Sequence, residues 1–347
     1  MVSRCSTRMV IEYLFVVKYI ICRGNMMTEP LILKPALHEK IWGGTALRDV
    51  YDFDIPSENT GEAWVISGHP NGPVTVTNGR YAGKTVAELW HDEPALFANK
   101  DVNRPFPLLV KILDAHRDLS VQVHPDDKYA GEHAGELGKT ESWYILSAEP
   151  GATIYYGHTA KDKQTFDQEV DNADWDKLLQ KVPVKAGDFF YVPSGTLHAL
   201  GEGVLTLETQ QSSDVTYRVY DFDRVDAKTG EKRDLHLADA KNVTTVPFVP
   251  IKPEQKVSHI EDLTLTELVA APYFNVVKWE IAGRATVDAT APYTLATVVD
   301  GDIELTVFGV TYTLAKGASF ILPNDVESWT INGHATLITS TPGPKSL

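Results

Sequence analysis

The sequence predicts a mainly β protein made of two β units with short helical insertions. Short apolar runs cut by Gly, Pro and Asn recur along most of the chain, a pattern typical of antiparallel strands joined by tight turns. The sequence contains neither a glycine-rich phosphate loop nor a β-α-β alternation, which disfavours P-loop and Rossmann nucleotide folds. The proline-rich stretch 246–256 separates two series of runs and predicts a linker or an extended crossover.

The first series of runs, up to residue 245, predicts strands interrupted by two helical segments. Residues 85–99 have the apolar periodicity of a helix, which Pro94 interrupts, and residues 160–181 form a polar, helix-like insert. Residues 221–232 are charged and rich in turn formers, so we expect an exposed loop there. The strands expected in this unit cover residues 60–67, 74–77, 108–113, 119–123, 143–146, 153–156, 189–192, 204–208 and 215–220.

The second series predicts a denser set of short strands. We expect tight turns at Asp300-Gly301-Asp302 and at Asn332-Gly333, because both segments combine Gly with turn-forming neighbours. Strands at this density indicate an antiparallel sandwich or barrel. They cover residues 274–281, 293–299, 303–307, 310–314, 320–322, 329–331 and 335–338.

The composition points to a protein that acts on small molecules. The 347 residues include 32 Lys and Arg against 47 Asp and Glu, a formal net charge of −15. Nucleic acid requires a basic footprint, and anionic membrane surfaces attract basic proteins, so we expect neither as a partner. A chain of this length buries a large core without disulfides or structural metals.

The first 26 residues differ from the rest. They hold both cysteines and four basic side chains against one Glu, and the remaining body has 28 basic and 46 acidic side chains, a net charge of −18. The apolar stretch 13–22 is too short to span a bilayer, and no small-residue cleavage site follows it. We expect residues 1–26 to be a non-native or mis-annotated leader, disordered, with translation starting at Met26 or Met27. A targeting role and a structured element are the alternatives, and the body is predicted to be cytoplasmic.

Three segments carry residue types that suit metal chemistry. Gln122 and His124 occupy positions i and i+2, so they point to one side of a strand, and Lys139 and Glu141 share the same relation. The third segment, 187–198, combines a strand, a Pro/Gly turn and a histidine just past the turn. Two histidines and one carboxylate suit a borderline divalent cation, to which Gln122 could add a neutral oxygen. Such a set leaves a position open for substrate or water, as catalytic sites do.

The spacing in these segments resembles the cupin signature. Its second motif, G-x5-P-x-G-x2-H, is met by Gly187, Pro193, Gly195 and His198. Its first motif usually reads His-x-His followed by Glu, whereas this chain has Gln-x-His. That variant beside Lys-x-Glu resembles the type I phosphomannose isomerases. The likeness extends from Leu31 to the C-terminus and includes the segments 42–44, 61–64, 107–115, 119–125 and 207–218.

The resemblance implies two cupin-type jelly rolls and a zinc enzyme that interconverts mannose 6-phosphate and fructose 6-phosphate. It implies a catalytic metal-binding domain over 27–245 and a metal-free cupin-like domain over 246–347, where the second motif is decayed. It also implies one Zn²⁺ per chain, a sugar phosphate as the small-molecule partner, and a monomer or weak homo-oligomer. The implied metal ligands are Gln122, His124, Glu141 and His198, and the implied catalytic residues are Arg218, Lys139 and Glu208.

The implied reaction explains this set of residues but leaves several roles open. An aldose–ketose isomerisation moves a proton between C2 and C1 through an enediol(ate), and Glu208, Lys139 or a water could carry it. Arg218 could neutralise enediolate charge or clamp phosphate, or it could be a structural ion-pair partner of a nearby aspartate. The substrate's phosphate needs a local basic patch, for which we predict Lys139 and Arg218 together with Lys111 or Arg224. Lys111 could alternatively be a strand lysine whose head reaches solvent.

Two other classes of function fit parts of the pattern. A cupin oxygenase could hold Fe(II) with the same two histidines and carboxylate. A non-catalytic cupin could bind metal and phosphosugar without turnover. The histidines without motif support are expected at the surface or in loops; they are His38, His69, His116, His133 and His158.

Overall fold

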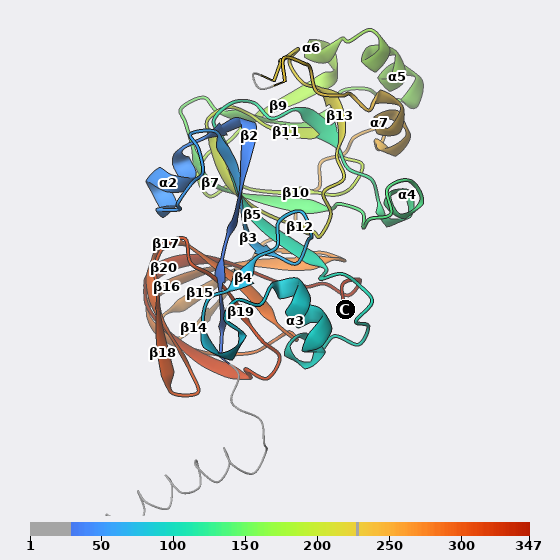
Figure 1. Ribbon diagram of the computed structural model, residues 1–347. Helices are drawn as coiled ribbons and strands as arrows, with labels where there is room; N and C mark the ends of the chain where they lie inside the picture. Colours follow the sequence, from blue (N-terminus) through green and yellow to red (C-terminus); the bar gives the residue numbers. More distant parts are fainter. Residues whose placement is uncertain (1–28, 227–228) are drawn as a thin grey trace, which may run out of the picture.

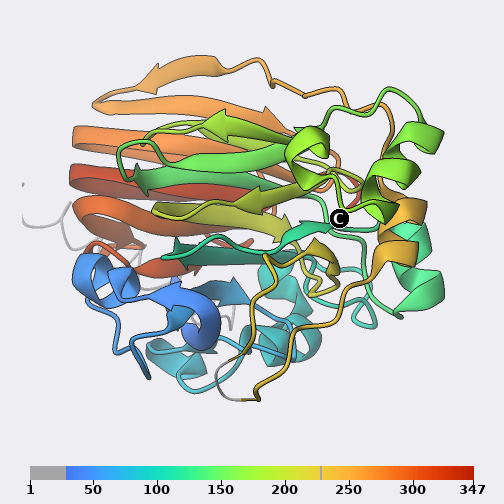
Figure 2. The same ribbon diagram turned by 90° about the horizontal axis from the view of Figure 1, so that it is seen from above.

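The chain folds into three antiparallel β-sheets stacked in layers, which we call the upper, middle and lower sheets (Figures 1 and 2). The computed structural model describes residues 29–226 and 229–347, so the predicted leader 1–26 lies outside the described residues. None of the helices within those ranges is long and apolar enough to cross a membrane. The prediction of a mainly β protein is confirmed.

The upper and middle sheets form the first β unit. The upper sheet has the strand order β13-β6-β11-β8-β9, and the middle sheet has the order β10-β7-β12-β5-β3-β2. The upper strands are β6 (Val121–Val123), β8 (Thr153–His158), β9 (Leu179–Pro183), β11 (His198–Leu200) and β13 (Tyr217–Tyr220). The middle strands are β2 (Ala36–Gly44), β3 (Thr60–Ser67), β5 (Leu108–Ala115), β7 (Glu141–Ala148), β10 (Phe189–Val192) and β12 (Val204–Gln211).

The lower sheet has a hydrophobic core of its own. Its strands come from segments before and after residue 245 in the sequence. Leu31 pairs in register with Ile321, and Leu33 pairs with Val76. The division into domains 27–245 and 246–347 stays a prediction. The nine lower strands are β1 (Leu31–Lys34), β4 (Thr75–Val76), β14 (Lys256–Ile260), β15 (Leu263–Ala270), β16 (Phe274–Asp288), β17 (Thr294–Val307), β18 (Val310–Leu314), β19 (Ser319–Leu322) and β20 (Ser328–Pro342).

Short helices cover the ends of the sheets. Helix α3 begins after Thr85, which forms a capping box with Glu88, and ends before Pro94, where a 3₁₀ turn follows. The predicted interruption at Pro94 is therefore confirmed. The helices are α2 (Ala46–Tyr51), α3 (Val86–Asp92), α4 (Asp127–His133), α5 (Lys163–Asp171), α6 (Trp175–Leu178) and α7 (Leu237–Val243), with 3₁₀ turns η1 (Gly79–Tyr81) and η2 (Pro94–Phe97).

The middle sheet is buried on both faces. Every residue of β5 is buried, with Leu108, Val110 and Ile112 in the core shared with the lower sheet. Leu113 belongs to the core shared with the upper sheet, and Lys111 points to the same side. This double burial explains why β5 is apolar at every position except Lys111 and Asp114 rather than alternating.

The two glycine turns predicted in the second unit are wrong. Asp300-Gly301-Asp302 lies inside the single strand β17, and Asn332-Gly333 lies inside β20. Gly301 has φ +71°, and a Cβ there would lie 2.0 Å from the carbonyl oxygen of His334 on β20. These glycines permit two long paired strands to bend and approach each other closely, which local turn propensity cannot distinguish from a chain reversal.

Gly301→Ala is therefore expected to lower the free energy of unfolding by about 3 kcal/mol or more, because it adds a backbone clash to an unfavourable positive φ. Gly309→Ala is the matched control. Gly309 also has a positive φ, of +81°, but a Cβ there meets nothing within 4 Å, so only about 1–2 kcal/mol should be lost. Urea unfolding of both variants measures the difference, and equal losses would contradict the close-approach explanation.

Candidate metal centre and active site

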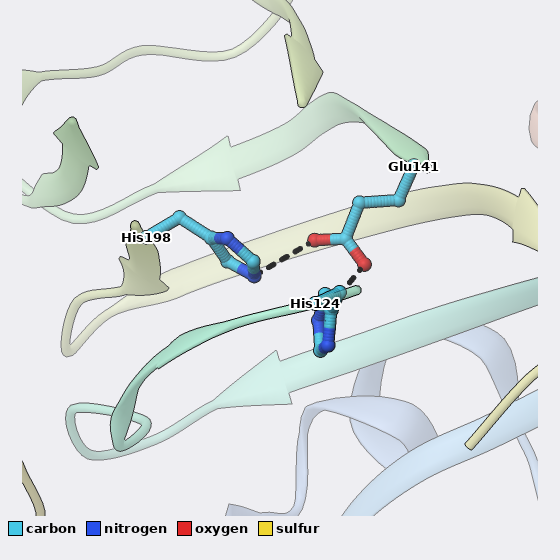
Figure 3. A group of neighbouring side chains, drawn as sticks. All are labelled: His124, Glu141 and His198. Atoms are coloured by element: carbon cyan, nitrogen blue, oxygen red, sulfur yellow. Dashed lines mark ion pairs between the residues drawn. The ribbon is translucent and has the colours of Figure 1, made fainter. Parts of the chain in front are cut away.

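The three sequence segments that suit metal chemistry meet between the upper and middle sheets. His124 follows β6, His198 begins β11, and Glu141 begins β7 on the facing sheet (Figure 3). Each side chain is only 1% exposed. One potential ligand atom from each residue lies within 4.8 Å of the other two. The structure thus brings together three of the four predicted metal ligands as a group that can hold a metal ion.

Backbone carbonyls orient both imidazole rings. Nδ1 of His124 lies 2.8 Å from the carbonyl oxygen of Val215, and Nδ1 of His198 lies 2.8 Å from that of Thr196. A carbonyl only accepts, so each Nδ1 carries a proton and donates it, and in the neutral ring Nε2 presents its lone pair. This outer contact is the one that metal-binding histidines usually make.

The lone pairs converge on a buried carboxylate. Nε2 of His198 lies 3.0 Å from Oε1 of Glu141, and Nε2 of His124 lies 3.5 Å from Oε2. Burial and Lys139 hold the pKa of His124 well below its ordinary value, so its ring is neutral. A lone pair that faces a carboxylate needs a proton or a metal ion between the two. Ligand bonds of about 2.1 Å place two ligands of a tetrahedral site about 3.4 Å apart, so these residues fit a divalent cation.

The hydrogen bonds that these atoms lack also indicate a site for a cation. Within the part of the chain that the structure describes, both carboxylate oxygens of Glu141 and Nε2 of His198 are buried without a hydrogen-bond partner. Burial alone would raise the pKa of Glu141, but its neighbours, above all the positive charge of Lys139, lower it well below its usual range. Lys139 compensates this buried, ionised carboxylate at Oε2, whereas Oε1 faces Nε2 of His198, so the carboxylate can accept a further cation there.

Lys139 lies beside the potential ligand atoms. Its Nζ is 3.0 Å from Nε2 of His124 and 3.1 Å from Oε2 of Glu141. Burial lowers the pKa of Lys139, but Glu141 and Glu208 outweigh burial and raise it above its ordinary value. Lys139 is therefore an ammonium at neutral pH. A divalent ion among these ligand atoms would repel the ammonium, which also lines the neighbouring cavity.

Gln122 lies next to this group. It is on β6, directly opposite His198 of β11 and also opposite Arg218 of β13. Its half-buried side chain lines the same cavity as Lys139. Opposed residues on neighbouring strands have Cβ atoms about 5 Å apart, so the position suits a ligand, and ligation by Gln122 stays a prediction.

Glu208 is a buried acid in this cavity. It lies on β12, where Nε1 of Trp143 donates to its Oε2 at 2.9 Å and Nζ of Lys111 lies 3.8 Å from its Oε1. Burial and Glu141 raise the pKa of Glu208, against the opposing effects of Lys139 and Lys111. A raised pKa makes a carboxylate a stronger base, as general acid–base catalysis requires.

Lys111 is held between two buried carboxylates. Its side chain is 4% exposed, and its Nζ lies 3.7 Å from Glu62 as well as 3.8 Å from Glu208. The alternative that Lys111 reaches solvent is therefore wrong. Glu62 also accepts from Nε1 of Trp64 at 2.7 Å and pairs with Lys40 at 3.0 Å. Sequence reasoning did not assign a role to Glu62, although the Gly-Glu-Ala-Trp segment was noted and the i,i+2 spacing places Glu62 and Trp64 on one face.

Lys111→Met is expected to lower the free energy of unfolding by about 3 kcal/mol, because it leaves two buried carboxylates without their shared cation. Lys40→Met is the matched control, since Lys40 pairs with the same Glu62 but is 31% exposed, and it should cost no more than about 1 kcal/mol. Urea unfolding gives both values. A Lys40→Met loss as large as that of Lys111→Met would contradict the assignment of Lys111 as the central cation.

Arg218 lines the same cavity on β13. Its Nε donates to Oγ of Ser120 at 3.2 Å, and its NH1 donates to the carbonyl oxygen of Asp234 at 3.0 Å. Among the described residues, no ion pair joins Arg218 to Asp214 or Asp221, so the structural ion-pair alternative lacks support.

The expected exposed loop 221–232 is borne out over its described residues except at its first one, and one histidine expectation is wrong. Asp221, at the start of the predicted exposed loop, is only 5% exposed, because it pairs with Arg224 and Arg233. His158, expected at the surface or in a loop, is the last residue of β8 and is 3% exposed, with Nε2 2.9 Å from the carbonyl oxygen of Thr245. The partners of Asp221 are nearby in the sequence, whereas His158 is buried against a residue 87 positions later.

Comparison with known proteins gives the family. Residues 31–147 match the model of the phosphomannose isomerase type I catalytic domain, and residues 264–342 match that of the mannose-6-phosphate isomerase cupin domain. A mannose-6-phosphate isomerase of Streptococcus mutans is 52% identical over 314 residues, covering 90% of this chain and 98% of the relative. The ManA mannose-6-phosphate isomerase of Bacillus subtilis is 47% identical, covering 91% and 99%.

Solved structures agree with this result. The crystal structure of a mannose 6-phosphate isomerase from Bacillus subtilis superposes with a TM-score of 0.87 at 48% identity, covering 90% of this chain and 99% of that one. The apo enzyme from Salmonella typhimurium, at 15% identity and a TM-score of 0.72 over 91% and 100% of the two chains, shares the fold. With the cupin fold and the identity over nine-tenths of its length, the chain belongs to the type I phosphomannose isomerase family.

Proposed function

We propose that this enzyme interconverts mannose 6-phosphate and fructose 6-phosphate with one zinc ion per chain, through an enediol(ate). One observation carries the proposal. The buried group of His124, Glu141 and His198 adjoins a cavity that contains the buried acid Glu208 and several cationic side chains. The family relationship and the names of the relatives support the choice of substrate.

Zinc would be held by the two imidazole nitrogens, the carboxylate of Glu141 and the amide oxygen of Gln122. Nitrogen and oxygen donors of this kind suit Zn²⁺, and the fixed Nε2 lone pairs favour a defined coordination. When bound, the ion would polarise sugar oxygens and stabilise negative charge that develops on them. Preference for zinc over other divalent ions is part of the proposal.

Glu208 is proposed as the proton carrier. In the aldose-to-ketose direction it would take the proton from C2 and return a proton to C1, while the hydroxyl hydrogen passes from O2 to O1. Its burial, its raised pKa and its fixed orientation by Trp143 and Lys111 suit both steps. A permanent ammonium is a poor base, so Lys139 is assigned to donate hydrogen bonds to the reacting oxygens, where negative charge builds up.

A coupled assay tests the proposed function. Protein of known metal content is given mannose 6-phosphate, and fructose 6-phosphate is followed with and without a chelator. We expect turnover that the chelator abolishes and added Zn²⁺ restores, with about one zinc per active chain. Metal-loaded protein that consumes oxygen with iron but does not isomerise would favour the cupin oxygenase. Binding of phosphosugar without any turnover would favour a non-catalytic role.

A further inference from the structure

We propose that Arg233 forms, together with Arg218, a clamp for the phosphate group of the substrate, and that Asp221 is the positioning residue that holds Arg233 in place. The inference rests on the proposed function, because it names the part of the site that would bind the phosphate of the sugar. The sequence had indicated Arg224 as a possible member of the basic patch, and it had not singled out Arg233.

The cavity beside the metal ligands is cationic although the protein is acidic. Its lining contains five basic side chains and three acidic ones, in a chain with a net charge of −15. The acids lie mainly opposite the lysines, since Glu62 pairs with Lys40 and Lys111, and Glu208 lies beside Lys111. Among the described residues, no acid of the lining forms an ion pair with either arginine.

Arg218 and Arg233 lie close enough to influence each other. Burial lowers the pKa of Arg218, and the positive charge of Arg233 lowers it further. Two neighbouring guanidinium groups facing one cavity repel, and an anion between them would relieve the repulsion. Arg218 also lies opposite Gln122 in register, so the clamp and the metal group occupy neighbouring strands of the upper sheet.

Both guanidinium groups are fixed before any ligand binds. Nε of Arg233 donates to Oδ2 of Asp221 at 2.8 Å, and its NH2 donates to Oδ1 at 2.6 Å, a bidentate contact. This contact uses two of the five N–H donors and leaves the others for a second oxyanion. Since Asp221 is buried and Ser120 holds Arg218, little side-chain entropy is lost when a phosphate binds.

Arg224 provides a contrast within the same cluster. Its NH2 donates to the same carboxylate of Asp221, and its remaining hydrogen bonds go to the carbonyl oxygens of Asp118 and Asp221. Among the residues that the structure describes, Arg224 is not part of the lining of the cavity, whereas Arg218 and Arg233 are. Arg224 therefore shares the anchor of Arg233 but lacks its access to the substrate.

The test compares Arg233→Gln with the matched control Arg224→Gln. For Arg233→Gln we expect KM for mannose 6-phosphate to rise about 10- to 100-fold, as for the loss of a charge-assisted contact, with kcat within about threefold of the parent. The inhibition constant of inorganic phosphate, used as a competitive probe, should rise by a similar factor. Arg224→Gln should change neither constant by more than about twofold, and Arg233→Lys should recover part of the lost affinity.

Several outcomes would overturn the clamp. Unchanged KM and unchanged phosphate inhibition in Arg233→Gln would remove Arg233 from the binding site. Equal effects of Arg233→Gln and Arg224→Gln would show that disturbance of Asp221 is the cause rather than lost contact with phosphate. Calorimetric titration of inorganic phosphate into zinc-loaded protein separates this inference from the proposed function. If the parent protein does not isomerise, the function fails, whereas phosphate binding that Arg233→Gln abolishes and Arg224→Gln retains would still support the clamp.

Discussion

Replacement of His198 by Ala is expected to lower metal affinity by at least a hundredfold and to abolish most of the isomerase activity. His198 supplies one of the converging lone pairs, and its Nε2 lies 3.0 Å from the carboxylate of Glu141. Loss of an outer contact to a metal ligand costs about 10- to 100-fold in affinity, so loss of a ligand itself should cost more. Metal analysis after dialysis against a chelator of graded concentration, together with kcat/KM, measures both effects.

The control for this substitution is His158→Ala. His158 is also a buried histidine, 3% exposed, but it lies outside the metal group and contacts the carbonyl oxygen of Thr245. Its replacement should reduce stability and leave the metal content of the folded protein unchanged. If His198→Ala keeps the full metal content while folded, His198 is not a ligand.

Replacement of Glu208 by Gln is expected to lower kcat by about 10²- to 10⁴-fold, the usual contribution of a general acid–base group. Gln has nearly the same shape and can still meet Nε1 of Trp143, but its amide cannot take a proton from carbon. None of the predicted metal ligands is changed, so the metal content should stay at the parent level. KM should change little, because the lost interaction belongs to the transition state.

Glu169→Gln is the control for charge loss from a buried glutamate. Glu169 lies on α5 with the same 4% exposure as Glu208 and pairs with Lys177, away from the cavity. It should leave kcat unchanged. Two results would contradict the assignment of Glu208: a kcat near that of the parent, or exchange of the C2 hydrogen with solvent at the parent rate. Either would assign the proton transfer to Lys139 or to a water.

The metal group could be predicted from the sequence because its constraints are local. The turn between Pro193 and His198 and the i,i+2 spacing of Lys139 and Glu141 are properties of short segments, and the family resemblance linked these segments. The positions of Glu62 and Arg233 were beyond such reasoning. Glu62 reaches Lys111 across paired strands, and Arg233 is held by a carboxylate twelve positions away, so no local pattern marks either as part of the site.

The fold was predicted at the level of strand content, and less well at the level of strand length. Strand β3 over Thr60–Ser67 agrees with the prediction because its apolar run ends at turn formers on both sides. The sequence predicted two short strands in place of each of the long strands β17 and β20. A glycine that is needed for close approach between strands has the same local pattern as a glycine in a turn. Placement of β1 in the lower sheet depends on pairing with β19, almost three hundred positions later, which no short segment encodes.

The middle sheet is buried on both faces, so the cavity on its upper face depends on the packing of its lower face against the lower sheet. Strands β5 and β12 present Lys111 and Glu208 on one face, while Leu207 and Val110 on the opposite face pack into the core shared with the lower sheet. Truncation of the chain after the first β unit would expose this apolar face to water. The C-terminal half therefore supports one wall of the cavity beside the metal group, and the two halves should melt as one cooperative unit.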